Sequence, residues 1–314
     1  MGKWLKSPKE LIFEVRNRVA YITLNRPDKR NALSINLHRE IVAACMEADD
    51  LNEVRVVVIQ GAGVDFCAGV DIASGPPAVQ SAELDYDPAD YRERENASLE
   101  DDIWLCEQSS QMRLIIHAMH KPVIAKVHGN CLAGGSDLAL NCDLVVASTE
   151  ARIGFPAVRA FGSPANHMWL YLVGPQWAKR MLMTGDLLTG ADAARIGLVL
   201  ESYPPDELDR EVDLLAQRLA VIPTDLQATH KRIVNVGLEL MGWQTLQRLA
   251  AENDGRAHMS HKFGEFFDNA RKLGFKEALR QRDAPYADRT GDARADSTVR
   301  LNMRGEAPRT GESA

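Results

Sequence analysis

The chain has 314 residues, of which 45% are hydrophobic, and its formal net charge at pH 7 is −7. Such a chain can bury a full core, but it has no apolar run near the roughly 20 residues of a membrane-spanning helix. The acidic balance argues against a general nucleic-acid surface, although a few local Lys and Arg residues would suffice to hold an anionic ligand.

The five cysteines are scattered and include no CxxC pair, and the eight histidines show no HExxH or comparable spacing. These patterns indicate reduced thiols rather than a disulfide framework, and they predict no metal site. The N-terminus has no apolar segment that ends at a small-residue cleavage site, so a secretory signal is not expected. We therefore expect a cytoplasmic protein with no bound metal and no membrane association.

The first half of the chain alternates β-rich runs with helical runs. Residues 18–27 (RVAYITLNRP) predict a strand that ends at Asn25-Arg26-Pro27, and residues 34–51 predict a helix with Ser34 as its N-cap. Residues 54–63 (VRVVVIQGAG) predict a strand that is buried on both faces. Two more strands, at 121–129 and 143–148, flank a short helix at 135–142. This alternation predicts an α/β fold with a parallel or mixed sheet and helices outside it.

The remaining regions divide the chain into expected domains. Residues 73–102 form an acidic, proline-containing segment, typical of either a functional lid or a disordered insertion. From Leu208 the chain is mostly helical, and the tail from 287 to 314 has too few apolar residues to pack. We expect a core over 1–205, a helical region over 206–286 and a disordered tail over 287–314.

Two glycine-containing segments each follow a predicted strand. They are residues 65–72 (DFCAGVDI) and residues 131–140 (CLAGGSDLAL). Glycine lets the backbone approach a ligand closely, and open α/β sheets bind ligands at the C-terminal ends of their strands. Two backbone N–H groups that converge there would hold a developing oxyanion, whereas the alternative is that each segment is only a tight turn.

Together with their neighbours, these segments resemble the crotonase superfamily of enoyl-CoA hydratases and isomerases. The matching pieces include Asn25-Arg26-Pro27, Asn31-Ala32-Leu33, His128-Gly129 and Cys142-Asp143, in the family's order. The resemblance implies an α/β crotonase fold, a spiral of repeated ββα units with a C-terminal helical trimerisation region. It also implies a homotrimer or dimer of trimers, and an acyl-CoA substrate with no cofactor beyond the coenzyme A that the substrate carries.

The resemblance implies a catalytic site built on three positions. The backbone N–H groups of Val70 and Gly134 match the family's oxyanion donors, and Asp137 occupies the place of the first catalytic glutamate. An acid in the first turn of a helix is also favourable without any chemistry, so both interpretations of Asp137 stay open. The place of the second glutamate, after Pro156, holds Ala157.

The loop after Ala157 offers other side chains. His167 could replace the missing base, because histidine titrates near neutrality, or it could be a packed helix residue. Arg159 could meet a substrate carboxylate or a neighbouring subunit.

The resemblance also implies a coenzyme A site. The matching positions are Lys29, Arg30, Ala32, Ala68, Asp71 and Ile72. Asp71 sits at a turn, as Asp143 does at a strand edge, and either could instead bond local N–H groups.

We therefore predict an enzyme that hydrates an enoyl-CoA thioester through an oxyanion-stabilised enolate. The alternatives on the same fold are isomerisation of an enoyl- or dienoyl-CoA, and hydrolytic C–C cleavage of a β-dicarbonyl. A further alternative is a catalytically weak acyl-CoA-binding protein, because the second glutamate is missing.

Overall fold

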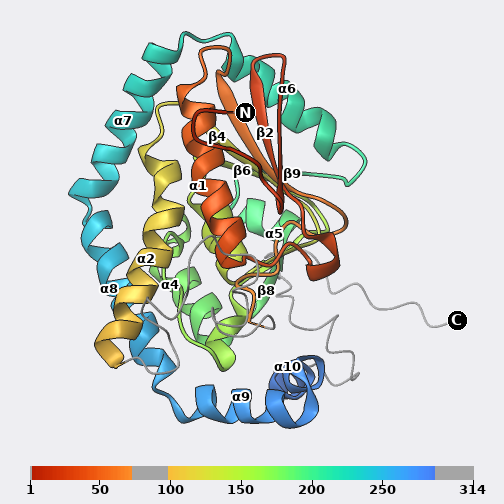
Figure 1. Ribbon diagram of the computed structural model, residues 1–314, viewed down its shortest axis with the longest axis vertical. Coiled ribbons are helices and arrows are strands. Elements are labelled where there is room, and N and C mark those ends of the chain that lie inside the picture. Colours follow the sequence, from red (N-terminus) through yellow and green to blue (C-terminus); the bar gives the residue numbers. More distant parts are fainter. Residues whose placement is uncertain (1, 73–97, 287–314) are drawn as a thin grey trace, which may run out of the picture.

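The structure is a computed structural model that describes residues 2–72 and 98–286 (Figure 1). The tail at 287–314 and most of the acidic segment at 73–102 lie outside the described residues, so the expectations for them stay predictions. Within the described chain there are two sheets and ten α-helices.

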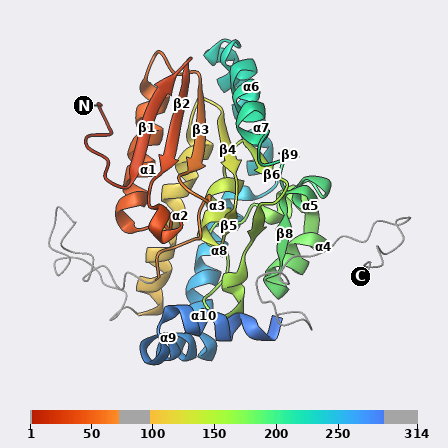
Figure 2. The same ribbon diagram turned by 90° about the vertical axis from the view of Figure 1, so that its right-hand side faces the viewer.

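The larger sheet has six strands in the order β1-β2-β3-β4-β6-β9, and β1 to β4 lie side by side in Figure 2. Its strands are β1 (Leu11–Arg16), β2 (Val19–Leu24), β3 (Val56–Gly61), β4 (Val123–Val127), β6 (Leu144–Ser148) and β9 (Glu201–Tyr203). β1 is antiparallel to β2, and every other neighbouring pair is parallel. The predicted mixed sheet is confirmed.

A smaller sheet carries one of the two glycine segments. Its strands are β5 (Asn130–Leu132), β7 (Arg152–Gly154) and β8 (Leu187–Thr189). β5 is parallel to β7, and β7 is antiparallel to β8. We did not predict these strands, because a three-residue strand is too short to show a period of two.

The described residues contain ten α-helices. They are α1 (Ile35–Asp50), α2 (Leu99–Ala118), α3 (Gly134–Leu140), α4 (Trp169–Thr184), α5 (Gly190–Arg195), α6 (Leu208–Ala220), α7 (Thr224–Leu240), α8 (Trp243–His258), α9 (His261–Leu273) and α10 (Phe275–Asp283). Val56 and Val58 of β3 share an apolar cluster with α6, whereas Val57 and Ile59 belong to the cluster that contains α1. The prediction that this strand is buried on both faces is confirmed.

Helix α2 begins inside the segment that we expected to be irregular. Ser98 is its N-cap, its hydroxyl accepts a hydrogen bond from the Asp101 N–H, and the Asp101 side chain bonds back to the Ser98 N–H. This capping box, with acids in the first turn, favours a helix start. The expected boundary at residue 102 was therefore wrong, because the acids that suggested a solvated loop stabilise a helix end.

The C-terminal helices fold back over the molecule. In Figure 1, α8 runs beside α2, and α9 and α10 lie at the end of the molecule opposite α6. Phe266 and Ala270 of α9 pack on Ala160, which follows the 3₁₀ turn η5 (Pro156–Arg159). Gly274 has φ +84° and separates α9 from α10, which interrupts the mostly helical region that we expected from Leu208 onward.

All five cysteines are buried and free of disulfides. Within the described ranges, no helix has the length and apolar character that a membrane crossing needs.

Candidate active site

The backbone N–H groups of Val70 and Gly134 lie close together, on the segments that follow β3 and β5. The Leu33 N–H donates to the Gly69 carbonyl at 2.8 Å, and the Asp71 N–H donates to the Leu33 carbonyl at 3.1 Å. This parallel bridge turns the intervening Val70 N–H away from Leu33. A Cβ atom built on Gly134 would lie 3.4 Å from the Val70 nitrogen, so the two segments touch at this point.

Both N–H groups are available to a ligand. Neither nitrogen donates to a backbone acceptor within the described part of the chain. Gly134 is the first residue of α3, where the N–H groups have no partner inside the helix. Val70 and Gly134 therefore form a pair of unused donors, which is the arrangement that holds an oxyanion.

The backbone that presents Gly134 is strained and tightly packed. Ala133, the N-cap of α3, has φ 50° and ψ −123°, a conformation that costs a non-glycine residue about 1–3 kcal/mol. Its carbonyl accepts the Asp137 N–H at 3.0 Å and the Ser136 hydroxyl at 2.7 Å. A Cβ atom on Gly135 would lie 2.4 Å from the Cys67 carbonyl oxygen, so only glycine permits this approach of the two segments.

Asp137 is a buried acid in the first turn of α3, with 3% of its surface exposed. Burial raises the pKa of Asp137 to about 8. The charge of Arg113 and a hydrogen bond from the Asn166 backbone lower this pKa, whereas the charge of Asp254 raises it. Its Oδ1 is enclosed and has no hydrogen-bond partner in the described structure. At neutral pH the side chain is therefore mainly a carboxylic acid that can donate a proton.

A buried arginine faces this acid from α2. Arg113 Nε donates to Asn166 Oδ1 at 2.6 Å, and Arg113 Nη1 lies 3.1 Å from His38 Nε2 and 3.2 Å from Ser109 Oγ. Asn166 Nδ2 donates to Ser110 Oγ at 2.7 Å. The arginine thereby holds Asn166, the loop residue whose backbone bonds to Asp137.

Sequence reasoning missed Arg113, although a signal was present. Ile103, Cys106, Ser110, Arg113 and Ile116 are buried and recur at intervals of three or four residues. They therefore form the core-facing stripe of α2. An arginine within such a stripe is an exception that sequence alone could have identified.

A cluster of polar side chains joins α2 to α8 near this acid. His258 Nδ1 lies 2.6 Å from Asp102 Oδ2, and His258 Nε2 lies 3.6 Å from Asp254 Oδ1. The Ser163 N–H donates to Asp254 Oδ1 at 2.9 Å. One side-chain atom from each of Asp102, Cys106 and His258 could ligate a metal, and these atoms lie within 4.8 Å of one another. Zinc binds carboxylate, thiolate and imidazole groups of this kind. Because the carboxylate and the imidazole bond directly, the cluster links the two helices by a hydrogen bond.

The structure separates the other residues of the loop from Asp137. The His167 N–H donates to Gln247 Oε1 of α8 at 2.9 Å, and its ring lines a separate cavity with residues of α8. Arg159 donates to Asp283 Oδ1 at 3.1 Å and to the Thr184 carbonyl at 3.1 Å. These groups of the same chain already bind Arg159, and the suggestion that it meets a substrate or a neighbouring subunit stays a prediction.

The expected coenzyme A residues lie on the loops that carry Val70. Lys29 and Arg30 are exposed, and the Ala68 N–H donates to the Arg30 carbonyl at 3.0 Å. Asp71 is buried and its Oδ2 lies 2.8 Å from Arg26 Nη2, so it serves the structural role that we weighed for it. Asp143 likewise accepts the Val123 N–H at 2.7 Å and pairs with Lys231.

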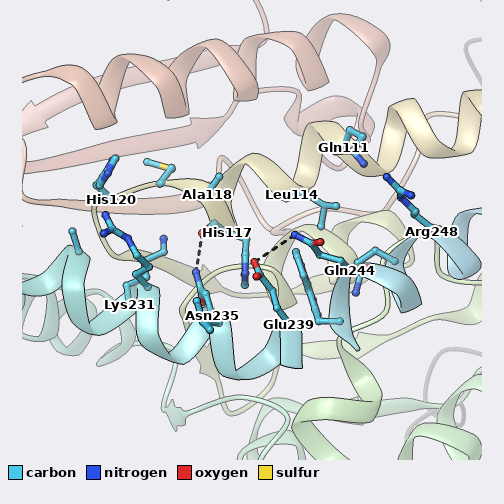
Figure 3. Close-up of a pocket in the computed structure, with 16 residues that line it drawn as sticks. Gln111, Leu114, His117, Ala118, His120, Lys231, Asn235, Glu239, Gln244 and Arg248 are labelled. Atoms are coloured by element: carbon cyan, nitrogen blue, oxygen red, sulfur yellow. Dashed lines mark hydrogen bonds between the residues drawn. The ribbon is translucent and has the colours of Figure 1, made fainter. Parts of the chain in front are cut away.

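A cavity of about 460 Å³ lies away from these residues, between α2, α7 and α8 (Figure 3). Asn235 Nδ2 donates to the His117 carbonyl at 2.9 Å, and Gln244 Nε2 donates to Glu239 Oε1 at 3.4 Å. His117 is stacked on Trp243. These polar groups are engaged in holding the helices together, so we assign the active site to the Val70, Gly134 and Asp137 region instead.

Comparison with known proteins gives consistent results. A family model described as enoyl-CoA hydratase/isomerase matches residues 14–264. A crotonyl-CoA hydratase of Syntrophomonas wolfei is 34% identical over 215 residues, 67% of this chain and 75% of that protein. A 2,3-dehydroadipyl-CoA hydratase of Escherichia coli is 32% identical over 228 residues, 71% of this chain and 81% of that protein. The crystal structure of an enoyl-CoA hydratase from Mycobacterium smegmatis superposes with a TM-score of 0.80 and 35% identity, covering 88% of this chain and 94% of that one.

Proposed function

Because this chain belongs to the enoyl-CoA hydratase/isomerase family, we propose that it adds water across the double bond of an enoyl-CoA thioester. The predicted crotonase fold is confirmed by the solved structures, and the relatives' names support the predicted hydratase-like function. One observation carries the proposal: two unused backbone donors lie beside the buried acid Asp137.

The two donors stabilise the charge that develops on the thioester oxygen. When water attacks the β-carbon, electrons move through the α-carbon to the carbonyl oxygen and form an enolate. The N–H groups of Val70 and Gly134 bind that oxyanion, and losing one such donor typically costs about 3–4 kcal/mol of barrier.

Asp137 handles the protons of the addition. Its carboxylic acid form gives a proton to the α-carbon, and the carboxyl group takes the proton that the attacking water loses at the β-carbon. The group thus ends the reaction protonated, as it began. A single acid can serve in this way because its pKa of about 8 keeps the proton at neutral pH. This matters here because Ala157 cannot supply the second carboxylate.

The decisive test is hydration of crotonyl-CoA by the wild type and Asp137→Asn, followed as loss of enoyl-thioester absorbance. The variant should lose at least about 100-fold in rate, and the wild-type rate should fall above about pH 8 as Asp137 loses its proton. Asp225→Asn removes an exposed first-turn acid of α7 and is the matched control. Equal rates in the wild type and Asp137→Asn would refute the role of Asp137.

The same assay addresses the alternatives. A shifted double bond without water addition would identify an isomerase, and release of a cleaved acyl fragment from a β-dicarbonyl ester would identify a hydrolase. Tight binding of coenzyme A esters without any turnover would favour a binding protein, a candidate that Ala157 keeps open.

We also propose that coenzyme A lies along the loop that carries Lys29 and Arg30, close to Ala32, Ala68 and Ile72. The exposed cations suit its phosphates. Lys29→Glu should therefore raise KM for crotonyl-CoA with less effect on kcat.

We propose a homotrimer, or a dimer of trimers, that uses the C-terminal helices. In support, large apolar side chains on α7 and just after it expose half or more of their surface: Leu226, Ile233, Val234, Leu240 and Met241. Sedimentation velocity should show a species of three or six chains, and a monomer would contradict the proposal.

A further inference from the structure

Arg113 is a buried cation whose nitrogens contact no carboxylate among the described residues, and the charges of Asp137 and Asp254 act on it only from a greater distance. Only 3% of its surface is exposed, and within the described chain no carboxylate oxygen lies within 4.0 Å of its nitrogens. Its bonded partners are the Asn166 amide oxygen, the Ser109 hydroxyl and a ring nitrogen of His38. A buried charge is costly unless it is paired, so this arrangement needs an explanation.

His38 does not supply the missing negative charge, and it is not a second cation. Its Nδ1 lies 3.0 Å from the Ser34 carbonyl, which can only accept, so Nδ1 carries the hydrogen and Nε2 accepts from Arg113. Burial, together with the charge of Arg113, lowers the pKa of His38 to about 3. The imidazole of His38 is therefore uncharged at neutral pH.

The guanidinium group still has donors to offer. Of the five N–H donors of an arginine, three bond to Asn166, His38 and Ser109. The two on Nη2 have no partner among the residues that the structure describes. Unlike Asp137 Oδ1, Nη2 is not one of the enclosed polar atoms that lack a partner. Nη2 therefore keeps a small exposed surface, although only 3% of the residue as a whole is exposed.

Hydrogen bonds link Arg113 to both halves of the candidate active site. On one side, Arg113 bonds to the Asn166 side chain, and the Asn166 backbone bonds to Asp137. On the other side, Arg113 contacts His38, whose ring bonds to the Ser34 carbonyl, and Ser34 follows Leu33, which pairs with Val70. These links connect Arg113 to both segments between which the acyl group of a thioester held by Val70 and Gly134 would lie.

We propose that Arg113 binds a second carboxylate carried by the acyl group, so that the preferred substrates are coenzyme A thioesters of dicarboxylic acids. The inference rests on the proposed function, because it needs the thioester to be held by Val70 and Gly134. A carboxylate would pair the buried guanidinium and use its free Nη2 donors. A neutral acyl chain would leave that charge buried without a partner.

Arg159 shows why the assignment goes to Arg113. Arg159 is also buried, but it contacts Asp283 at 3.1 Å and its guanidinium lies 4.1 Å from the ring of Tyr286. Its charge is matched within the chain. Only a cation that lacks such a match gains from a carboxylate that the substrate brings.

The experiment measures binding by isothermal titration calorimetry with matched pairs of saturated esters: succinyl- against butyryl-CoA, glutaryl- against valeryl-CoA, and adipyl- against hexanoyl-CoA. Three proteins are compared: the wild type, Arg113→Met, which has similar length and no charge, and Arg113→Lys, which keeps the charge. In the wild type, at least one dicarboxylyl ester should bind about tenfold or more tightly than its neutral partner. Arg113→Met should reduce that ratio to about one, and Arg113→Lys should keep part of it.

Several outcomes would overturn the proposal. These are equal affinities for every pair in the wild type, a preference for the neutral esters, or a ratio that Arg113→Met leaves unchanged. Thermal unfolding shows whether Arg113→Met is folded, and if it is not, the wild-type and Arg113→Lys ratios still decide the matter.

The proposed function is tested separately with the unsaturated esters crotonyl-CoA and 2,3-dehydroadipyl-CoA. Tighter binding of the dicarboxylyl esters, without hydration of either unsaturated ester, would refute the hydratase function and support the role of Arg113. Hydration of both unsaturated esters at equal efficiency, without a binding preference, would support the hydratase function and refute the role of Arg113.

Discussion

Two polar regions flank the active site, and they differ in how completely their charges are matched. In the loop before α1, Arg26 pairs with Glu10 at 2.7 Å and with Asp71 at 2.8 Å. Asn31 is fully buried, and its side chain bonds to three backbone groups, including the Asp65 carbonyl. In the region of α2 and α3, by contrast, Arg113 and Asp137 are both buried without a direct ion pair between them.

This difference separates scaffold from function. A network with every donor and acceptor satisfied fixes one backbone arrangement, and here it fixes the loops that present Val70. Buried charged groups without a partner lower the free energy of unfolding. A folded protein keeps such groups only where they serve another purpose. The loop before α1 therefore positions the site, whereas the unmatched Arg113 and Asp137 are the groups to which we assign roles on the substrate.

The largest expected effect comes from breaking the matched region. Arg26→Gln leaves Asp71 and Glu10 without their cation, and removing one partner of a buried pair costs about 3–5 kcal/mol. Urea unfolding should show this loss, whereas Lys3→Gln, which removes an exposed pair with Asp50, should change stability by about 1 kcal/mol or less. Similar losses for both variants would mean that the network before α1 has no special role.

A smaller effect of opposite sign is expected from Asp137→Asn. The unfolded chain ionises Asp137 near its ordinary pKa of 3.8, but the folded chain keeps the proton up to about pH 8. Between these values the unfolded state binds fewer protons, so wild-type stability falls by about 1.4 kcal/mol per pH unit from this group. Asparagine does not titrate.

Denaturant unfolding at several pH values measures the contribution of Asp137 to the free energy of unfolding. The stability of Asp137→Asn relative to the wild type should rise by about 3 kcal/mol between pH 5 and pH 7. Asp225→Asn, which makes the same change at an exposed acid in the first turn of α7, is the control variant. A constant difference between Asp137→Asn and the wild type would show that the acid is ionised throughout.

The smallest effect concerns the strained backbone of the site. Ala133→Gly removes the Cβ atom at φ 50°, so it should stabilise the fold by about 1 kcal/mol. Ala257→Gly in the regular helix α8 should instead destabilise it by about 1 kcal/mol. Thermal unfolding of the two variants measures the contrast, and a loss of stability in Ala133→Gly would argue against strain at this position.

Much of the fold could be predicted from the sequence because its signals are local. The strands at β2, β3, β4 and β6 have β-rich runs, and Ser34 caps α1 as expected. The glycine segments and Asp137 could be found because turn chemistry and motif order are properties of neighbouring residues. The start of α2 and the break at Gly274 were missed, because an acidic run and a single glycine each fit two local structures.

The sequence by itself determined the α/β class, the family resemblance and the two glycine segments that carry Val70 and Gly134. Only the tertiary structure decided that Arg113, 24 positions before Asp137, is linked to that acid through Asn166, and that Arg159 and His167 bond to other groups. The physical reason is that charge pairing is non-local. Whether a buried charge is matched depends on groups brought together from different helices and loops, and no pattern along the chain records that distance.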